Sequence, residues 1–261
     1  MNLGLAGKTA WVGGSSKGLG RACAEALAKE GAKVIISSRN VSELEIAVQE
    51  MSSLGLDVAG FPVDLSSQQT VSESMSQIVE DFGGIDIAVL NSGGPVAGKF
   101  MELSDSEWDH WYYGSLGYVR DICRILLPGM VEKKWGRIIT ITSIVASEPE
   151  SSLTLSSVYR GGVLNLVKIL SSDFAMDGVT VNNVSPGAFK TNRAIQLMKD
   201  RSSRTGESLK EIEADSTSNL PMGKYQSPEE CGNVVAFLSS ELSSGITGVN
   251  LRIDGGIAKG I

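Results

Sequence analysis

Three side chains that an active site could use lie close together in the stretch SSVYRGG, residues 156–162. They are the hydroxyl of Ser156, the phenol of Tyr159 and the guanidinium of Arg160. The stretch begins a segment with helical apolar spacing, and residues four apart share a face of a helix, so Ser156 and Arg160 are expected to point the same way. Tyr159 follows Ser156 by three residues, and helical side chains lean toward the N-terminus, so its ring could extend over the Ser156 turn.

A second candidate site is the glycine-rich stretch TAWVGGSSKGLGRACAEAL, which places Gly14, Gly18 and Gly20 between an apolar run and an amphipathic segment. Glycine lets the backbone turn tightly and approach a phosphate, which the amides at the start of the following helix can then bind. A glycine triplet alone is weak evidence, but its position between a predicted strand and a predicted helix favours a nucleotide site.

The rest of the chain predicts the elements that must position these residues. Short apolar runs alternate with longer segments of helical apolar spacing, which is typical of strands joined by crossover helices. We therefore predict a single doubly wound α/β domain, with a parallel sheet of about seven strands and helices on both faces, in which ligands bind beyond the C-terminal strand ends. The predicted strands cover residues 9–13, 33–38, 57–63, 85–91, 136–143, 179–186 and 248–254.

Composition limits the classes of partner. The chain has 261 residues, 42% of them hydrophobic, and no long linker, so we expect one domain over residues 1–261. A net charge of −7 argues against nucleic acid or an anionic membrane as the main partner. The three cysteines, Cys23, Cys123 and Cys231, are far apart and suggest neither a disulfide framework nor a metal site. Without a signal-like start or a long apolar run, the expected location is the cytoplasm.

One segment breaks the alternation of strands and helices. Residues 190–226 are long, polar and without a strand pattern, although two short helices could lie within them. A long excursion just after a strand end predicts a substrate lid. The alternative is a surface insertion without a role.

The spacing GxxxGxG resembles the nucleotide loop of the short-chain dehydrogenase/reductase family, and the resemblance extends over the chain. NSGG at 91–94 is similar to the family's NNAG element, and GRIITITS ends at Ser143, where the family has its catalytic serine. VTVNNVSPGAFKT resembles the sixth strand and cofactor clamp, and residues 227–256 resemble the C-terminal signature. The resemblance implies a Rossmann-type fold, a dinucleotide cofactor and a homo-oligomer, either a tetramer or a dimer.

The same resemblance implies a set of cofactor-binding residues, with Asp64 and Leu65 beside the adenine. No acidic residue closes the second strand to bind a ribose 2′-hydroxyl, whereas Arg39 and Lys17 could bind a 2′-phosphate, so NADP(H) is favoured over NAD(H). The alternative is that both cations merely face solvent. The full set is Gly14, Ser16, Lys17, Gly18, Leu19, Gly20, Arg39, Asp64, Leu65, Asn91, Ser92, Gly93, Arg160, Pro186, Gly187 and Thr191.

The catalytic positions differ from the family pattern. In the family, three residues separate the active-site Tyr from the active-site Lys. When this chain is aligned with the family pattern without a gap, Ser156 stands at the position of the Tyr and Arg160 at the position of the Lys. Ser143 supports this register, because Ser156 follows it by thirteen residues, a spacing that is common between the family's catalytic Ser and Tyr. The family's earlier Asn falls at Ser115. Of the four catalytic positions, only Ser143 keeps the family residue.

These replacements change what the site can do. An aliphatic hydroxyl is a far weaker acid than a phenol, so Ser156 is a poor proton donor, and Arg160 can bind ribose hydroxyls but cannot relay a proton. Tyr159, or water held by Ser115 and Ser156, remains as donor, although Tyr159 could instead pack between subunits.

Two functions are compatible with this pattern. The first is an NADP(H)-dependent oxidoreductase that moves hydride to or from a carbonyl or alcohol, with a small ketone or a 3-oxoacyl thioester as the first substrate to test. The second is an NADP-binding protein with little or no turnover and a regulatory or structural role. Neither function requires a metal.

Overall fold

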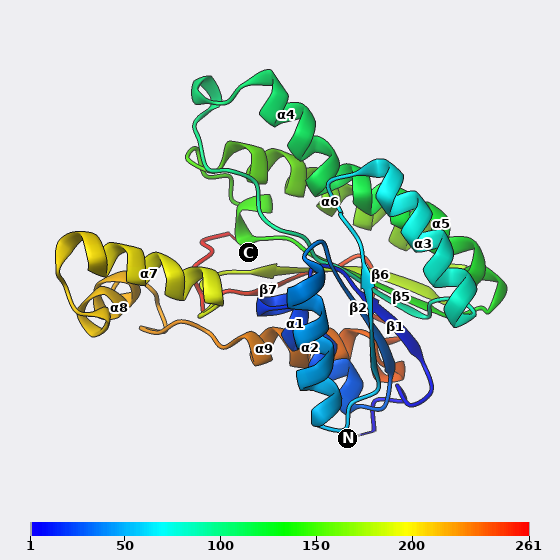
Figure 1. Ribbon diagram of the computed structural model, residues 1–261. Coiled ribbons are helices and arrows are strands. Elements are labelled where there is room, and N and C mark those ends of the chain that lie inside the picture. Colours follow the sequence, from blue (N-terminus) through cyan, green and yellow to red (C-terminus); the bar gives the residue numbers. More distant parts are fainter. Residues whose placement is uncertain (1, 261) are drawn as a thin grey trace.

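The computed structural model describes residues 2–260, without the side chains of residues 193 and 197. Seven strands form one sheet in the order β3-β2-β1-β4-β5-β6-β7, and each pair of neighbours is parallel (Figure 1). This confirms the predicted doubly wound sheet of seven strands. The strands are β1 (Thr9–Val12), β2 (Lys33–Ser38), β3 (Val58–Pro62), β4 (Ile87–Leu90), β5 (Gly136–Ile141), β6 (Val179–Pro186) and β7 (Asn250–Ile253).

Helices cover both faces of the sheet, because successive strand residues point to opposite sides. Val34 and Ile36 of β2 are buried with α1 (Gly18–Lys29), α2 (Val41–Ser53) and α9 (Pro228–Leu238), whereas Ile35 is buried on the other face. That second face carries α3 (Gln68–Phe82), α5 (Tyr118–Glu132) and α6 (Thr154–Asp173), and α4 (Asp105–Tyr112) packs on α6. Each face therefore has its own hydrophobic core.

The helical stretch from α4 to α5 contains an interruption. Between α4 and α5 the backbone forms a π-helical segment, Tyr113–Gly117, and the helical direction continues through it. Such segments are rare and occur often at functional sites. The three cysteines are buried and free, as expected of core residues.

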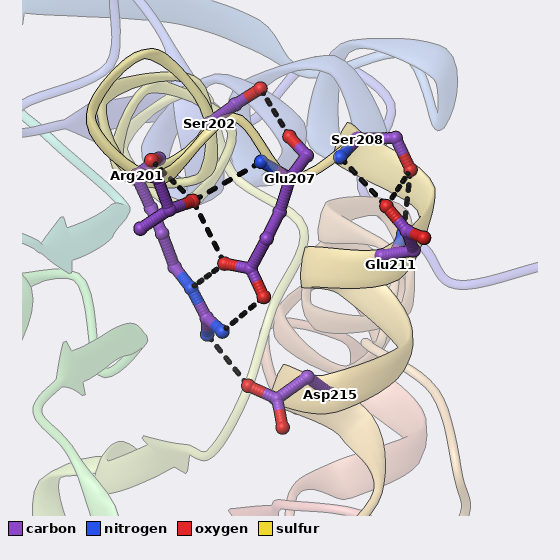
Figure 2. Close-up of polar contacts among 7 residues, drawn as sticks. Arg201, Ser202, Glu207, Ser208, Glu211 and Asp215 are labelled. Carbon is purple, nitrogen blue, oxygen red and sulfur yellow. Dashed lines mark hydrogen bonds and ion pairs between the residues drawn. The ribbon is translucent and has the colours of Figure 1, made fainter.

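The predicted lid segment, residues 190–226, contains α7 (Asn192–Thr205) and α8 (Leu209–Thr217), and in Figure 1 this yellow pair projects beyond the end of the sheet. The two ends of the segment lie side by side, because Lys190 N donates to Gln226 O at 2.8 Å. Figure 2 shows how Arg201 joins the two helices, with Nε 3.1 Å from Glu207 Oε2 and Nη1 2.6 Å from Asp215 Oδ2. The segment is thus a compact helical hairpin on a narrow base.

The strand order also locates the main crevice. β1 lies between β2 and β4, so β2 and β3 extend the sheet on one side of β1, and β4 to β7 extend it on the other side. The crevice beyond the carboxyl ends of these strands is where open α/β sheets bind ligands. Every helix within residues 2–260 is too short or too polar to span a lipid bilayer.

Candidate cofactor and active site

The glycine loop joins β1 to α1 at this crevice. Gly14 and Gly18 have φ of +55° and +63°, in the left-handed region that favours glycine. A Cβ on Gly20 would lie 2.4 Å from the carbonyl oxygen of Gly14, so no larger residue fits there. Lys17 precedes α1 without a capping hydrogen bond from its side chain, and the first turn of α1 contains no acidic residue. This geometry fits the phosphates of a dinucleotide, which the first-turn amides would hold.

Asn91, at the end of β4, ties that strand to the glycine loop. Its Nδ2 donates to Gly13 O at 3.2 Å and to Gly14 O at 3.1 Å. The next residue, Ser92, donates from Oγ to Gly114 O at 3.1 Å, in the π-helical segment. The end of β4 therefore fixes the loop on one side and the π-helical segment on the other.

A cavity of about 510 Å³, here called the β2-side cavity, opens beside the ends of β2 and β3. It brings together most of the residues predicted for the adenosine half of the cofactor. Those lining it are Gly14, Ser16, Lys17, Arg39, Asp64, Leu65, Asn91, Ser92 and Gly93, together with Ser38, Asn40, Glu43, Val63, Ser66, Gly94, His110, Trp111 and Gly114.

A second cavity of about 250 Å³, here called the Ser143 cavity, lies beside the ends of β5 and β6. Asn91 and Ser92 line both cavities, so the two meet at the end of β4. The residues lining it are Leu19, Asn91, Ser92, Ile141, Thr142, Ser143, Arg160, Pro186, Gly187, Phe189 and Thr191. Between them the two cavities contain every predicted cofactor residue except Gly18 and Gly20, which shape the loop.

The two predicted cations lie in the β2-side cavity in different settings. Lys17 Nζ is 2.9 Å from Glu43 Oε1, an ion pair with the start of α2. Arg39 is exposed and acts on Asp64. Burial acts to raise the pKa of Asp64, but hydrogen bonds from Ser66 and the charge of Arg39 outweigh it, so the pKa of this carboxyl lies below its usual value.

Ser143 follows the end of β5 and begins the 3₁₀ turn Ile144–Ala146, where its Oγ accepts from Val145 N at 3.4 Å. Arg160 reaches the same strand end from α6 and donates from Nη1 to the carbonyl oxygen of Thr142. The structure thus brings Ser143 and Arg160 into one cavity. Ser156 is buried one turn before Arg160 on α6 and is not among the residues that line the cavity.

Tyr159 points away from this cavity, toward α4. Its hydroxyl donates to Trp108 O at 2.8 Å, and its ring contacts Trp108 and Tyr112 edge to face. Burial, and then the negative charge of Asp109, raise the pKa of Tyr159 above its usual value. To donate a proton beside Ser143 this phenol would have to leave its bond to Trp108, so its catalytic role stays a prediction.

Ser115 lies in the middle of the π-helical segment. It is 5% exposed, and its Oγ has no hydrogen-bond partner among the described residues. α6 packs closely on this segment, because a Cβ on Gly162 would lie 3.1 Å from Leu116 Cδ2. A buried hydroxyl without a partner is costly, so Ser115 is a candidate to bind a water molecule or a ligand.

Sequence reasoning missed two residues of the site. Tyr118 is a buried phenol: burial raises its pKa, and a hydrogen bond with Ser92 and the charge of Arg160 oppose that shift. Glu43 is the carboxylate paired with Lys17. An aromatic residue in an apolar helix pattern and a glutamate at the start of a helix are common features, so neither gave a signal before the elements were assembled. No cluster of three or more metal-ligating side chains occurs within residues 2–260.

Comparison with known proteins gives the family. A family model described as enoyl-(acyl carrier protein) reductase matches residues 14–258, nearly the whole chain. The chain belongs to the short-chain dehydrogenase/reductase family. A relative in this family, the 3-oxoacyl-(acyl-carrier-protein) reductase of Aquifex aeolicus, is 31% identical over 98% of this chain and 100% of its own. The cyclohexanol dehydrogenase of a Rhodococcus species is 31% identical over 98% of each protein.

Solved short-chain dehydrogenase/reductase structures superpose over the full chain. L-sorbose reductase from Gluconobacter frateurii, in complex with NADPH and L-sorbose, has a TM-score of 0.95 at 30% identity, with all of both chains covered. Actinorhodin polyketide ketoreductase with NADPH has a TM-score of 0.90 at 29% identity, over 97% of this chain and 98% of its own. The relatives named here thus include both reductases and a dehydrogenase, and they act on chemically different substrates.

Proposed function

We propose that the protein is an NADP(H)-dependent oxidoreductase that moves hydride to or from a carbonyl or alcohol substrate. The observation that carries this proposal is the pair of neighbouring cavities that share Asn91 and Ser92, one lined by Ser143 and Arg160 and the other by residues of the glycine loop. Two structural neighbours of about 30% identity hold NADPH on the same fold, which supports the choice of cofactor. The cofactor supplies the hydride when bound.

The residues of the protein would bind the cofactor and orient it. The first-turn amides of α1 and the glycine loop would hold the pyrophosphate, and Arg39, Lys17 and the serines beside them would hold the 2′-phosphate. Asp64 and Leu65 would border the adenine. Pro186, Gly187 and Thr191 line the Ser143 cavity and would fix the nicotinamide end.

At the reacting end, Ser143 would donate a hydrogen bond to the substrate oxygen and polarise the carbonyl. Arg160 would bind ribose hydroxyls and stabilise negative charge, because its guanidinium stays protonated. This division follows from the register that places Ser156 and Arg160 where the family has Tyr and Lys.

The proton comes from water in this proposal. Tyr159 is bound to Trp108 O, whereas Ser115 Oγ is buried and has no hydrogen-bond partner among the described residues. Water held by Ser115 and Ser156 could protonate an alkoxide, at a lower rate than a positioned phenol.

The substrate class proposed first is a ketone or a 3-oxoacyl thioester, on the strength of the similarity to the 3-oxoacyl-(acyl-carrier-protein) reductase named above. The helical hairpin of residues 190–226 would act as the lid that selects it. A cytoplasmic homotetramer or homodimer is the form expected from the family.

A direct test follows NADPH absorbance with a panel of ketones, 3-oxoacyl thioesters and, in the reverse direction, alcohols with NADP⁺. We expect turnover with at least one class, and a Ser143→Ala variant that binds NADPH as tightly as wild type but turns over about 100- to 1000-fold more slowly. Cofactor binding without turnover across the panel would favour the second candidate, a nucleotide-binding protein with a regulatory or structural role. The proposed register, in which both Tyr and Lys are replaced, keeps this candidate open.

A further inference from the structure

A carboxylate occupies the part of the β2-side cavity where the cations lie. Asn40 caps α2 by accepting from Glu43 N at 3.1 Å, so Glu43 stands in the first turn. Its side chain reaches back across the cavity, with Oε1 2.9 Å from Lys17 Nζ and Oε2 3.5 Å from Ser16 Oγ. Ser16 Oγ also lies 3.3 Å from Ser38 Oγ. The Lys17 ammonium and the Ser16 hydroxyl thus contact an anion that belongs to the protein itself, and the Ser38 hydroxyl lies beside Ser16.

The same groups are those that would bind a phosphate monoester. A monoester carries close to two negative charges near neutral pH and takes hydrogen bonds from ammonium and hydroxyl donors. It cannot share the Lys17 ammonium with a carboxylate without repulsion between the two anions. A 2′-phosphate would therefore have to displace Glu43 before it could use Lys17.

A second ion pair joins the same two helices, so the displacement of Glu43 need not separate them. Arg21 Nη1 lies 2.5 Å from Glu50 Oε2, and Arg21 Nε lies 2.8 Å from Glu25 Oε1. Arg21 is held twice and its side chain is 26% exposed, whereas the Lys17 and Glu43 side chains are 58% and 41% exposed. Exposed single ion pairs contribute little stability, so the Lys17–Glu43 pair can open while the Arg21–Glu50 pair still joins α1 to α2.

We propose that Glu43 is a specificity-determining residue, which holds Lys17 when no cofactor is bound and competes with the 2′-phosphate for it. The carboxylate lowers the affinity for NADPH and leaves that for NADH nearly unchanged, so it reduces the discrimination that Lys17 and Arg39 provide. This inference rests on the proposed function, because it takes the β2-side cavity as the 2′-phosphate site.

The experiment measures dissociation constants for NADPH and NADH by fluorescence titration of the full chain. In Glu43→Gln we expect NADPH to bind about three- to tenfold more tightly, with NADH within about twofold of wild type. The gain should shrink at high salt, because the groups are exposed and screened. Melting temperatures without cofactor check that each variant folds.

Two matched controls separate the ion pair from its neighbours. Glu45→Gln removes the same charge from an exposed site on α2 outside the cavity lining, and Glu50→Gln removes the other cross-helix partner. Both should bind NADPH within about twofold of wild type. In a Lys17→Gln background, Glu43→Gln should increase NADPH affinity less than it does in wild type, because the competition for the ammonium requires both partners.

The outcomes distinguish the inference from the function beneath it. If Glu43→Gln binds NADPH no more tightly than wild type, the competition is wrong while the proposed cofactor stands. If Glu43→Gln loses affinity for NADH alone, the carboxylate accepts from ribose hydroxyls and the inference is overturned. If the wild-type chain binds neither nucleotide, the proposed function itself is wrong.

Discussion

The two ends of the crevice differ in how they keep the family pattern. At the glycine loop the site consists largely of backbone, where Gly14 and Gly18 adopt left-handed φ and Gly20 admits no Cβ. At the end of β5 the site consists of side chains, and there only Ser143 keeps the family residue in the register proposed here. Backbone geometry tolerates few substitutions, whereas side-chain chemistry can be altered while the fold stands. In the register proposed here, the binding end is preserved and the reacting end has changed.

The largest expected effect separates the two ends. Ser143→Ala removes the proposed hydrogen bond to the substrate oxygen, and kcat should fall about 100- to 1000-fold. The dissociation constant for NADPH should stay within about twofold of wild type, since the preserved end is untouched. Steady-state kinetics and fluorescence titration measure the two quantities. Equal loss of binding and turnover would show that the ends are not separable.

The second effect concerns the preserved end. Gly20→Ala would place a Cβ 2.4 Å from Gly14 O and force the loop apart. We expect NADPH affinity to fall about 30- to 100-fold, from a strain of about 2 to 3 kcal/mol. Gly245→Ala is the matched control, because no heavy atom lies within 4 Å of its Cβ position. Unchanged NADPH binding in Gly20→Ala would contradict the claim that NADPH binding depends on a glycine at this position of the loop backbone.

Arg160 tests whether the reacting end still helps to hold the cofactor. Arg160→Ala should weaken NADPH binding about tenfold, as expected for the loss of a charge-assisted hydrogen bond, while Arg160→Lys should keep most of the affinity. Titration of both variants with NADPH gives their dissociation constants relative to that of wild type. An effect on turnover alone would assign Arg160 to the chemistry and contradict the binding role.

The smallest effect is expected at Tyr159. Tyr159→Phe removes the hydrogen bond to Trp108 O and should reduce the free energy of unfolding by about 1 kcal/mol, with kcat within about twofold of wild type. Denaturant unfolding and steady-state kinetics provide the check. A large loss of kcat with unchanged stability would restore the phenol as proton donor and make the reacting end less altered than proposed.

The sequence predicted the features that depend on pattern and backbone. The seven strands and the glycine loop follow from periodicity and from glycine requirements, and the position of the crevice follows from the meeting of parallel strand ends at one edge. The common site of Ser143 and Arg160 was implied by the family resemblance. The direction of Tyr159 could not be predicted, because it depends on where α4 crosses α6. The Lys17–Glu43 pair joins two helices whose separation no local pattern encodes.

The π-helical segment was also beyond the reach of the sequence. Tyr113–Gly117 continues a helical pattern, and one extra residue in a turn leaves almost no trace in apolar spacing. Tyr118 follows it and is buried with its phenol beside Ser92 and Arg160. Both features concern the reacting end, where side-chain contacts between elements decide the chemistry.

The most direct test of the account is hydride transfer itself. NADPH carrying deuterium at its transferable position is incubated with the protein and the ketone or 3-oxoacyl substrate that gives the most turnover, and the product is analysed by mass spectrometry. The account predicts deuterium on the carbon that was the carbonyl carbon, at a rate that falls with Ser143→Ala. Tight NADPH binding with no deuterium in any product would contradict it.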